Sequence, residues 1–418
     1  MTTAANDSLA SPDEFNTTER INLAESVARF TQKHIAADLS EWERAGRIPR
    51  EIHVLAADVG ILGIGYPEEV GGSGGDPVDQ SVVTQALIQA GGSGGVIAGL
   101  FTHGIALPHI IDEADRRRAK GDSAGADYLV QHYIRPVLAG ELICALAVTE
   151  PDGGSDVAAL RTRGTWTSPT TSSGGGTDSA GVVASGRTLS VTGNKTYITS
   201  GVRADFVVAA VRTGGPGAAG VSLVIIDTNS PGFDVVRSLD KMGWHCSDTA
   251  ELAFTDVGVP EANVLGPEMG FASLARHFVT ERLSLAVTGY ATAQRCMDLV
   301  RPWARDRETF GRPLATRQVV RHTLVEMHRS TDVARTYTRW VAARHARGEQ
   351  VTTEALLAKQ SAVEACEYVV DRAVQLFGGA GYMRDSEVER HYRDSRILGI
   401  GGGSTEVMTD LAARLLDV

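Results

Sequence analysis

The stretch of residues 149–156, TEPDGGSD, carries side chains and backbone suited to hold a diphosphate or the edge of a ring. It follows an apolar run that reads as a strand, and Pro151 ends that strand. The two glycines would let the backbone come close to a ligand, and Ser155 offers a hydroxyl. Taken alone, the same residues could equally form a tight turn, so both interpretations stay open at this point.

Glu281 is the second candidate, because it precedes a stretch without any charge. Residues 283–293 are mostly apolar or small on every face, which predicts a helix that is buried all round. A carboxylate beside it would be partly desolvated, and desolvation raises a carboxyl pKa toward neutrality, which suits a general base. The alternative is a glutamate that faces solvent at the start of a helix, where the helix dipole favours it.

Other motifs that could carry catalytic or binding chemistry lack the sequence context that such chemistry requires. G-x-S-x-G occurs at residues 71–75, 91–95 and 121–125, but none follows an apolar strand, as a hydrolase nucleophile elbow requires. The chain has no P-loop and no strand-linked G-x-G-x-x-G, which argues against a P-loop or Rossmann nucleotide site. The four cysteines are scattered without a C-x-x-C, so we expect reduced thiols, no disulfide framework and no metal site.

The composition limits the possible partners. With 418 residues, the chain is long enough for two or three domains. Its net charge of −11 argues against nucleic acid or an anionic membrane as the main partner. Unbroken apolar runs are far shorter than the roughly 20 residues of a membrane span. The first residues are acidic and lack an apolar core, so we expect no signal or transit peptide and a cytoplasmic location.

The order of the expected elements is helical, then β, then helical. Residues 1–142 predict an N-terminal all-α domain with a helix from about residue 17, and 143–265 show the short alternating runs of an antiparallel β domain. Residues 167–181 predict a long hairpin insertion, and 266–418 return to a helical pattern. This α+β order differs from the βαβ alternation of a doubly wound fold.

Ordered motifs along almost the whole chain resemble those of the acyl-CoA dehydrogenase flavoproteins. Residues 149–156 resemble the TEPGAGSD signature of that family. The other matching segments are 66–72 (YPEEVGG), 195–200 (KTYITS), 247–249 (SDT), 254–260 (FTDVGVP), 307–318 (RETFGRPLATRQ), 375–382 (QLFGGAGY) and 393–394 (RD). The resemblance implies an N-terminal all-α domain, a central antiparallel β-barrel and a C-terminal four-helix bundle, in agreement with the order of elements.

The resemblance implies FAD as the cofactor and assigns residues to it. Those expected near the flavin ring and the phosphates are Val148, Thr149, Gly154, Ser155, Tyr197 and Thr199. Those expected at the adenosine diphosphate half, two of them across a dimer interface, are Arg307, Phe310, Gln318, Gln375, Gly379, Ser404 and Glu406. Ser155 could also contact the phosphates of a CoA substrate.

The expected catalytic base departs from the commonest family pattern. Most members carry the glutamate in a Y-E-G-T segment near the C-terminus, and the alignment puts Gly402 at that place. A subgroup that resembles isovaleryl-CoA dehydrogenase carries it in a segment like L-E-R-L, which residues 280–283 (TERL) match. The resemblance therefore implies Glu281 as the base, with the Gly402 backbone N–H kept as a donor to the thioester carbonyl. Glu406 is the alternative carboxylate.

The implied reaction is α,β-dehydrogenation of an acyl thioester to the trans-2-enoyl thioester, in fatty acid or amino acid catabolism. Arg282 would position the glutamate or bind substrate, and Val279 replaces an aspartate that contacts the CoA arm in some members. That replacement leaves acyl-CoA and acyl-carrier thioesters both open. The family further implies an electron-transfer flavoprotein or similar acceptor and a homotetramer. The alternatives are another flavin chemistry on this scaffold (oxidase, hydroxylase or desulfinase) and a non-catalytic partner subunit.

Overall fold

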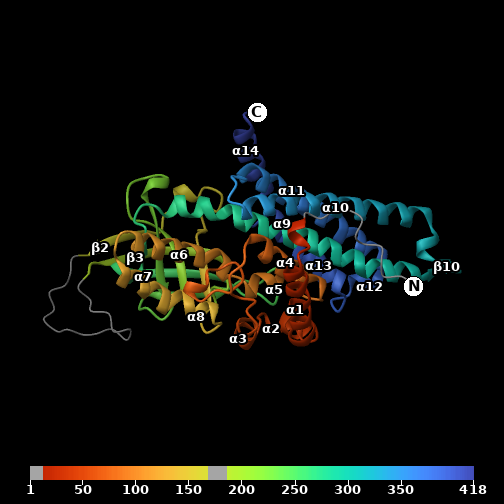
Figure 1. Ribbon diagram of the computed structural model, residues 1–418, viewed down its shortest axis with the longest axis horizontal. Helices are drawn as coiled ribbons and strands as arrows, with labels where there is room; N and C mark the ends of the chain where they lie inside the picture. The colour runs from red at the N-terminus through yellow and green to blue at the C-terminus, as the bar shows by residue number, and fades with distance from the viewer. Residues whose placement is uncertain (1–12, 168–185) are drawn as a thin grey trace. The chain divides into compact units, whose positions relative to one another are not determined.

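The computed structural model describes residues 13–167 and 186–418, which form two compact units (Figure 1). The described residues of the first unit are 13–98, 241–246 and 278–418. Those of the second unit are 99–167, 186–240 and 247–277. The predicted division into three domains at residues 142 and 265 stays a prediction. Residues 168–181 of the predicted hairpin insertion at 167–181 lie outside the described residues.

Helices form the N-terminal part, as the sequence predicts. Helix α1 (Thr18–His34) begins after Thr17, whose side chain accepts the N–H of Arg20. Helix α4 (Pro77–Gln89) begins with a capping box between Asp76 and Asp79. The other helices of this part are α2 (Leu39–Ala45), α3 (Glu51–Asp58), α5 (Gly94–Leu100), α6 (His103–Ala119), α7 (Ser123–Leu129) and α8 (Arg135–Leu138), with one turn of π-helix at Val130–Ile134.

One helical stretch in the described part of the chain, Gly94–Ala119, is long and apolar enough to cross a membrane. Of its most apolar window, 72% is buried inside the protein. Burial of this kind is the pattern of a core helix in a folded domain, and it accounts for the apolar composition without a lipid environment.

The second unit contains an eight-stranded sheet. Its strands are β1 (Cys144–Ala147), β2 (Arg163–Thr167), β3 (Thr188–Thr199), β4 (Phe206–Arg212), β5 (Val221–Asp227), β6 (Phe233–Ser238), β7 (Thr249–Pro260) and β8 (Val264–Leu265). The order is β6-β7-β3-β2-β4-β5-β8, with β1 beside β4. Apolar side chains of β3, β4, β5 and β7 form its core.

The predicted antiparallel sheet is correct for most pairs and wrong for two. Strand β4 pairs in parallel with β1 and, through one residue pair, with β2. The sheet is therefore mixed, because the chain between β1 and β4 returns through β2 and β3 before β4 is laid beside β1. No pair between β6 and β8 occurs among the described strands, so closure into a barrel stays a prediction.

The C-terminal part is helical, as predicted. Long helices α10 (Gln318–Ala346) and α11 (Thr352–Phe377) run side by side (Figure 1). The other elements are α9 (Gly270–Asp306), α12 (Gly379–Tyr382), α13 (Glu387–Ser395), α14 (Thr405–Leu416) and the short hairpin of β9 (Glu308–Thr309) and β10 (Arg312–Pro313). Residues 283–293 are buried almost throughout, with Ser284 exposed and Leu285 half-buried, which confirms the prediction of a buried helix.

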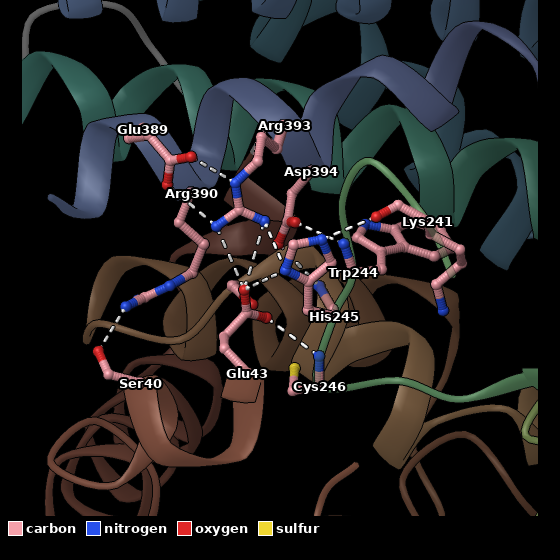
Figure 2. Close-up of polar contacts among 12 residues, drawn as sticks. Ser40, Glu43, Lys241, Trp244, His245, Cys246, Glu389, Arg390, Arg393 and Asp394 are labelled. Carbon is pink, nitrogen blue, oxygen red and sulfur yellow. Dashed lines mark hydrogen bonds and ion pairs between the residues drawn. The ribbon is translucent and has the colours of Figure 1, made fainter. Parts of the chain in front are cut away.

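The segment Lys241–Cys246 belongs to the first unit because polar contacts fasten it to α13 and α2 (Figure 2). The buried carboxylate of Asp394 accepts the Trp244 N–H at 2.6 Å. Arg393 pairs with Glu43 at 3.3 Å, and Glu43 in turn accepts the Cys246 N–H at 3.1 Å. The RD motif at residues 393–394 thus holds together parts of the chain that are far apart in the sequence.

Candidate active site

Glu281 and Gly402 lie against each other in the first unit. Glu281 is half-buried on α9, and Gly402 lies in the turn before α14 with a φ of +64°. A Cβ built on Gly402 would lie 3.2 Å from Glu281 Oε1 and 2.6 Å from Leu285 Cδ1. The carboxylate from the helix therefore occupies the direction in which a side chain at position 402 would extend. The structure brings together the two residues to which the sequence analysis assigned catalysis.

The surroundings of Glu281 perturb its ionisation in two opposite ways. Burial raises the pKa of the carboxyl group, while the charges of Lys359 and Arg282 lower it, and the net direction is upward. The side chain is therefore not a solvent-facing helix-start glutamate. A raised carboxyl pKa is what an acceptor of a weakly acidic proton needs near neutral pH.

Lys359 is a residue of this site that the sequence analysis missed. It lies on α11 and is completely buried. Its Nζ donates hydrogen bonds to the carbonyl oxygens of Gly401 and, at 2.8 Å, of Gly403. The sequence did contain a signal that this lysine is buried. It lies on the same face of the helix as Ala355, Ala358 and Ala362, which are buried too.

Arg282 is buried beside Glu281, with its guanidinium 5.3 Å from the centre of the Phe278 ring. Burial lowers the pKa of the guanidinium. Its Nε has no hydrogen-bond partner among the described residues. A buried, incompletely paired cation is costly in a folded protein, and such groups are typical of sites that bind a further polar group.

The loop that begins at Thr149 lies in the second unit and is held by a buried ion pair. Lys195 Nζ contacts a Glu150 carboxylate oxygen at 2.9 Å and donates to the Val148 carbonyl at 2.9 Å. The Thr196 N–H donates to the Thr149 carbonyl at 2.9 Å. These bonds fix the backbone of 148–150 against strand β3, and the binding role of the loop stays a prediction.

The tip of the same loop is open to solvent. Glu150 and Gly153 form an isolated backbone bridge, and Ser155 is exposed. A Cβ on Gly153 would meet nothing within 4 Å, and one on Gly154 would lie 3.3 Å from the Thr149 methyl group. A fixed backbone beside an accessible hydroxyl fits the phosphates or ring edge of a cofactor.

Tyr197 is turned outward by an irregularity in strand β3. The register between β3 and β7 shifts between Lys195 and Ile198, and Tyr197 has a φ of +60°. The side chain is 70% exposed although it lies within a strand, and Thr199 is half-buried near the end of that strand. Bulges of this kind re-aim a side chain. An outward ring next to a fixed loop fits a flat ring system such as flavin.

The residues assigned to the adenosine half lie on the surface of the first unit. Phe310 is 97% exposed, at a φ of +51°, in the hairpin of β9 and β10. The other exposed positions are Arg307, Gln318, Gln375, Gly379 and Glu406. Ser404 is half-buried because its side chain caps α14 by accepting the Val407 N–H at 3.4 Å. Their accessibility is compatible with a bound cofactor.

Comparison with known proteins identifies the family. Models of the N-terminal, middle and C-terminal domains of acyl-CoA dehydrogenase match residues 17–117, 145–257 and 268–416. The long-chain specific acyl-CoA dehydrogenase of Sus scrofa is 31% identical over 93% of this chain and 84% of that protein. The isovaleryl-CoA dehydrogenase of Solanum tuberosum is 31% identical over 94% and 89%.

A solved structure leads to the same family. A probable acyl-CoA dehydrogenase from Mycobacterium abscessus is 55% identical, with a TM-score of 0.87, over 96% of this chain and 100% of that one. The ordered motifs along the chain agree with these matches. The chain therefore belongs to the acyl-CoA dehydrogenase family, whose members are FAD-dependent oxidoreductases.

Proposed function

We propose that this protein is an FAD-dependent acyl-CoA dehydrogenase in which Glu281 takes the α-proton of the substrate. The observation that carries the proposal is the contact of Glu281 with Gly402 in a partly desolvated setting. Gly402 has no side chain, so Glu281 is the carboxylate at this place. The product is a trans-2-enoyl thioester, after the α-proton has passed to Glu281 and the β-hydrogen has left as hydride.

The Gly402 N–H is suited to the substrate carbonyl. In the described part of the chain it donates no hydrogen bond to the protein, while the neighbouring Gly401 N–H donates to the Ile397 carbonyl at 2.8 Å. A donor aimed at the thioester oxygen stabilises the negative charge that develops there when the α-proton leaves. Because this donor is backbone, a glycine at 402 retains it.

The residues present fit FAD. Val148, Thr149 and Tyr197 would hold the ring, Gly154 and Ser155 the phosphates, and Thr199 would lie near the reactive nitrogen. When bound, FAD supplies the acceptor of the β-hydrogen. The adenosine half is assigned to Arg307, Phe310, Gln318, Gln375, Gly379, Ser404 and Glu406, as the resemblance implies. Arg282 and Ser155 are further proposed substrate contacts, on the basis of the unpaired Nε and the exposed hydroxyl.

The partners of the reaction follow the family. We take acyl-CoA as the substrate, an electron-transfer flavoprotein as the acceptor and a homotetramer as the working assembly. The exposed apolar side chains of Phe310 and Val319, 97% and 70% exposed, support a subunit contact that would cover them. The four buried, unpaired cysteines support a reducing compartment such as the cytoplasm.

The test is anaerobic turnover with a ferrocenium acceptor on butyryl-CoA, isovaleryl-CoA and palmitoyl-CoA. Wild-type protein should be yellow and should lose its flavin absorbance with at least one of them. Glu281→Gln should retain FAD and lose about 10³-fold or more in kcat/KM, since the base is gone. Glu364→Gln makes the same change at an exposed position of α11 and is the matched control.

Two results would contradict the proposal. Near wild-type turnover by Glu281→Gln would remove this residue from proton transfer. Absence of bleaching by all three thioesters, in protein that does contain FAD, would favour another flavin chemistry on the same scaffold, and release of hydrogen peroxide in air would identify an oxidase.

A further inference from the structure

We propose that Lys359 is a positioning residue of the active site: its ammonium group sets the orientation of the Gly402 peptide and places a positive charge beside Glu281. The inference rests on the proposed function, because it assigns a task to the surroundings of the base. It concerns a residue of α11 that lies outside the sequence motifs that identify the family.

The geometry around Gly402 is the first argument. Lys359 Nζ binds the carbonyl oxygens of Gly401 and Gly403, so it holds the peptide that joins Gly401 to Gly402 and the peptide that follows Gly403. The peptide bonds of the described chain are all trans, and in a trans peptide the C=O and the N–H point in opposite directions. When Lys359 fixes the Gly401 carbonyl, the Gly402 N–H is turned away from the lysine, where it is free to bind a ligand.

The chemistry of the contact is the second argument. A hydrogen bond from an ammonium group polarises the Gly401 carbonyl, and polarisation along one peptide strengthens its N–H as a donor. Three glycines in a row, two of them at φ values of +64° and +97°, leave this turn without side chains that could hold its shape. Lys359, from α11, therefore restrains the conformation of the turn at 401–403, which glycine alone leaves free to vary.

The charge distribution is the third argument. The point where a Gly402 Cβ would lie is 3.2 Å from Glu281 Oε1 and 3.6 Å from Lys359 Nζ, so the two opposite charges face the same space. Among the described residues, the other charge that acts on Glu281 is Arg282 of its own helix. From α10, His345 contacts the neighbouring Thr280 at 3.2 Å. Lys359 is therefore the cation that reaches Glu281 from a packed neighbouring helix.

Burial is the fourth argument. A completely buried lysine is unfavourable unless its partners compensate for lost hydration, and burial lowers the pKa of Lys359 to about 8. An apolar residue would fill this place on α11 at no such cost. Its partners are two backbone carbonyls and a nearby carboxylate, all of which belong to the proposed site.

The experiment compares Lys359→Met and Lys359→Gln with wild type, and uses Lys33→Met, an exposed lysine on α1, as the matched control. Each holoenzyme is reduced with dithionite so that hydride transfer cannot occur. The α-hydrogen exchange of the best of the three acyl-CoAs is then followed in D₂O by NMR, as a function of pH. Flavin absorbance and circular dichroism establish cofactor content and folding.

The expected result has two parts. Lys359→Met should lower the exchange rate by about 10- to 100-fold, because the donor loses its orientation. The acid limb of the exchange profile should move up by about one pH unit, because loss of a nearby positive charge raises a carboxyl pKa by roughly that amount or more. Lys359→Gln retains donors without the charge, so it should show the same shift with a smaller loss of rate.

The outcomes separate this inference from the proposed function. If Glu281→Gln exchanges at the wild-type rate, both the base and the positioning role are wrong. If Glu281→Gln is inactive but the folded Lys359 variants keep the wild-type rate and acid limb, Lys359 alone is refuted. If Lys359→Met does not fold, an unshifted limb in Lys359→Gln refutes the charge effect, and a shifted limb supports it.

Discussion

The substitution Gly402→Ala directly tests the contact between Glu281 on helix α9 and Gly402 in the turn before α14. The added Cβ would lie 2.6 Å from Leu285 Cδ1, a separation that real Cβ atoms essentially never show, and 3.2 Å from Glu281 Oε1. Leu285 Cδ1 and Glu281 Oε1 are the ends of flexible side chains, so relief of the overlap costs about 1 kcal/mol, the low end of the range for overpacking. A non-glycine residue at a φ of +64° adds about 1 kcal/mol. We therefore expect a loss of about 2 kcal/mol in the free energy of unfolding.

The catalytic activity of Gly402→Ala should fall together with its stability. To relieve the overlap, Leu285 or Glu281 must move by several tenths of an ångström or more, and misplacement of a reacting group by about 1 Å costs around 10²-fold in rate. We expect kcat to fall by about 10- to 100-fold while FAD remains bound. Urea unfolding and ferrocenium turnover measure the two effects.

Gly348→Ala is the matched control. Gly348 also has a positive φ, +79°, and lies in the first unit, but an added Cβ there would meet nothing within 4 Å. This variant should lose about 1 kcal/mol from backbone strain and keep full turnover. If Gly402→Ala loses no more stability than Gly348→Ala and keeps wild-type kcat, then Glu281 does not lie where the structure places it.

Two further predictions concern the supports of the site. Lys195→Met leaves the buried Glu150 carboxylate without its cation, so the FAD dissociation constant should rise at least about tenfold, measured by flavin fluorescence; unchanged affinity would refute the role of this clamp. Asp394→Ala removes the acceptor of the Trp244 and Gly95 N–H groups and should cost about 2–5 kcal/mol in urea unfolding, whereas Asp385→Ala, at an exposed position, should cost almost nothing; equal losses would contradict this account.

Local features of the chain are readable from the sequence because their causes are local. The start of α1 after Thr17 depends on one cap, and the burial of residues 283–293 depends on the absence of charge along one helix. The order of helical and β regions depends on hydrophobic periodicity within short windows. The end of strand β1 is an exception, because it lies at Ala147 and not directly before Pro151 as predicted.

The assignment of Glu281 needed more than periodicity. The residues alone allowed a solvent-facing glutamate, and the resemblance chose the base. The contact with Gly402 comes from residues far apart in the chain, and it depends on how α9 and the turn before α14 pack. Sequence spacing carries no information on such a contact, because loop closure over that length can bring many pairs together.

The segments that become helices and strands, and the motifs they carry, follow from local sequence. Three features follow only from the packing of distant segments: β1 lies parallel to β4, Tyr197 turns outward at a bulge, and Lys359 binds the carbonyls of Gly401 and Gly403. Helix and strand formation depends on neighbours within a few residues. Pairing, register and buried charge contacts depend on which distant surfaces pack together, and only the folded chain defines those surfaces.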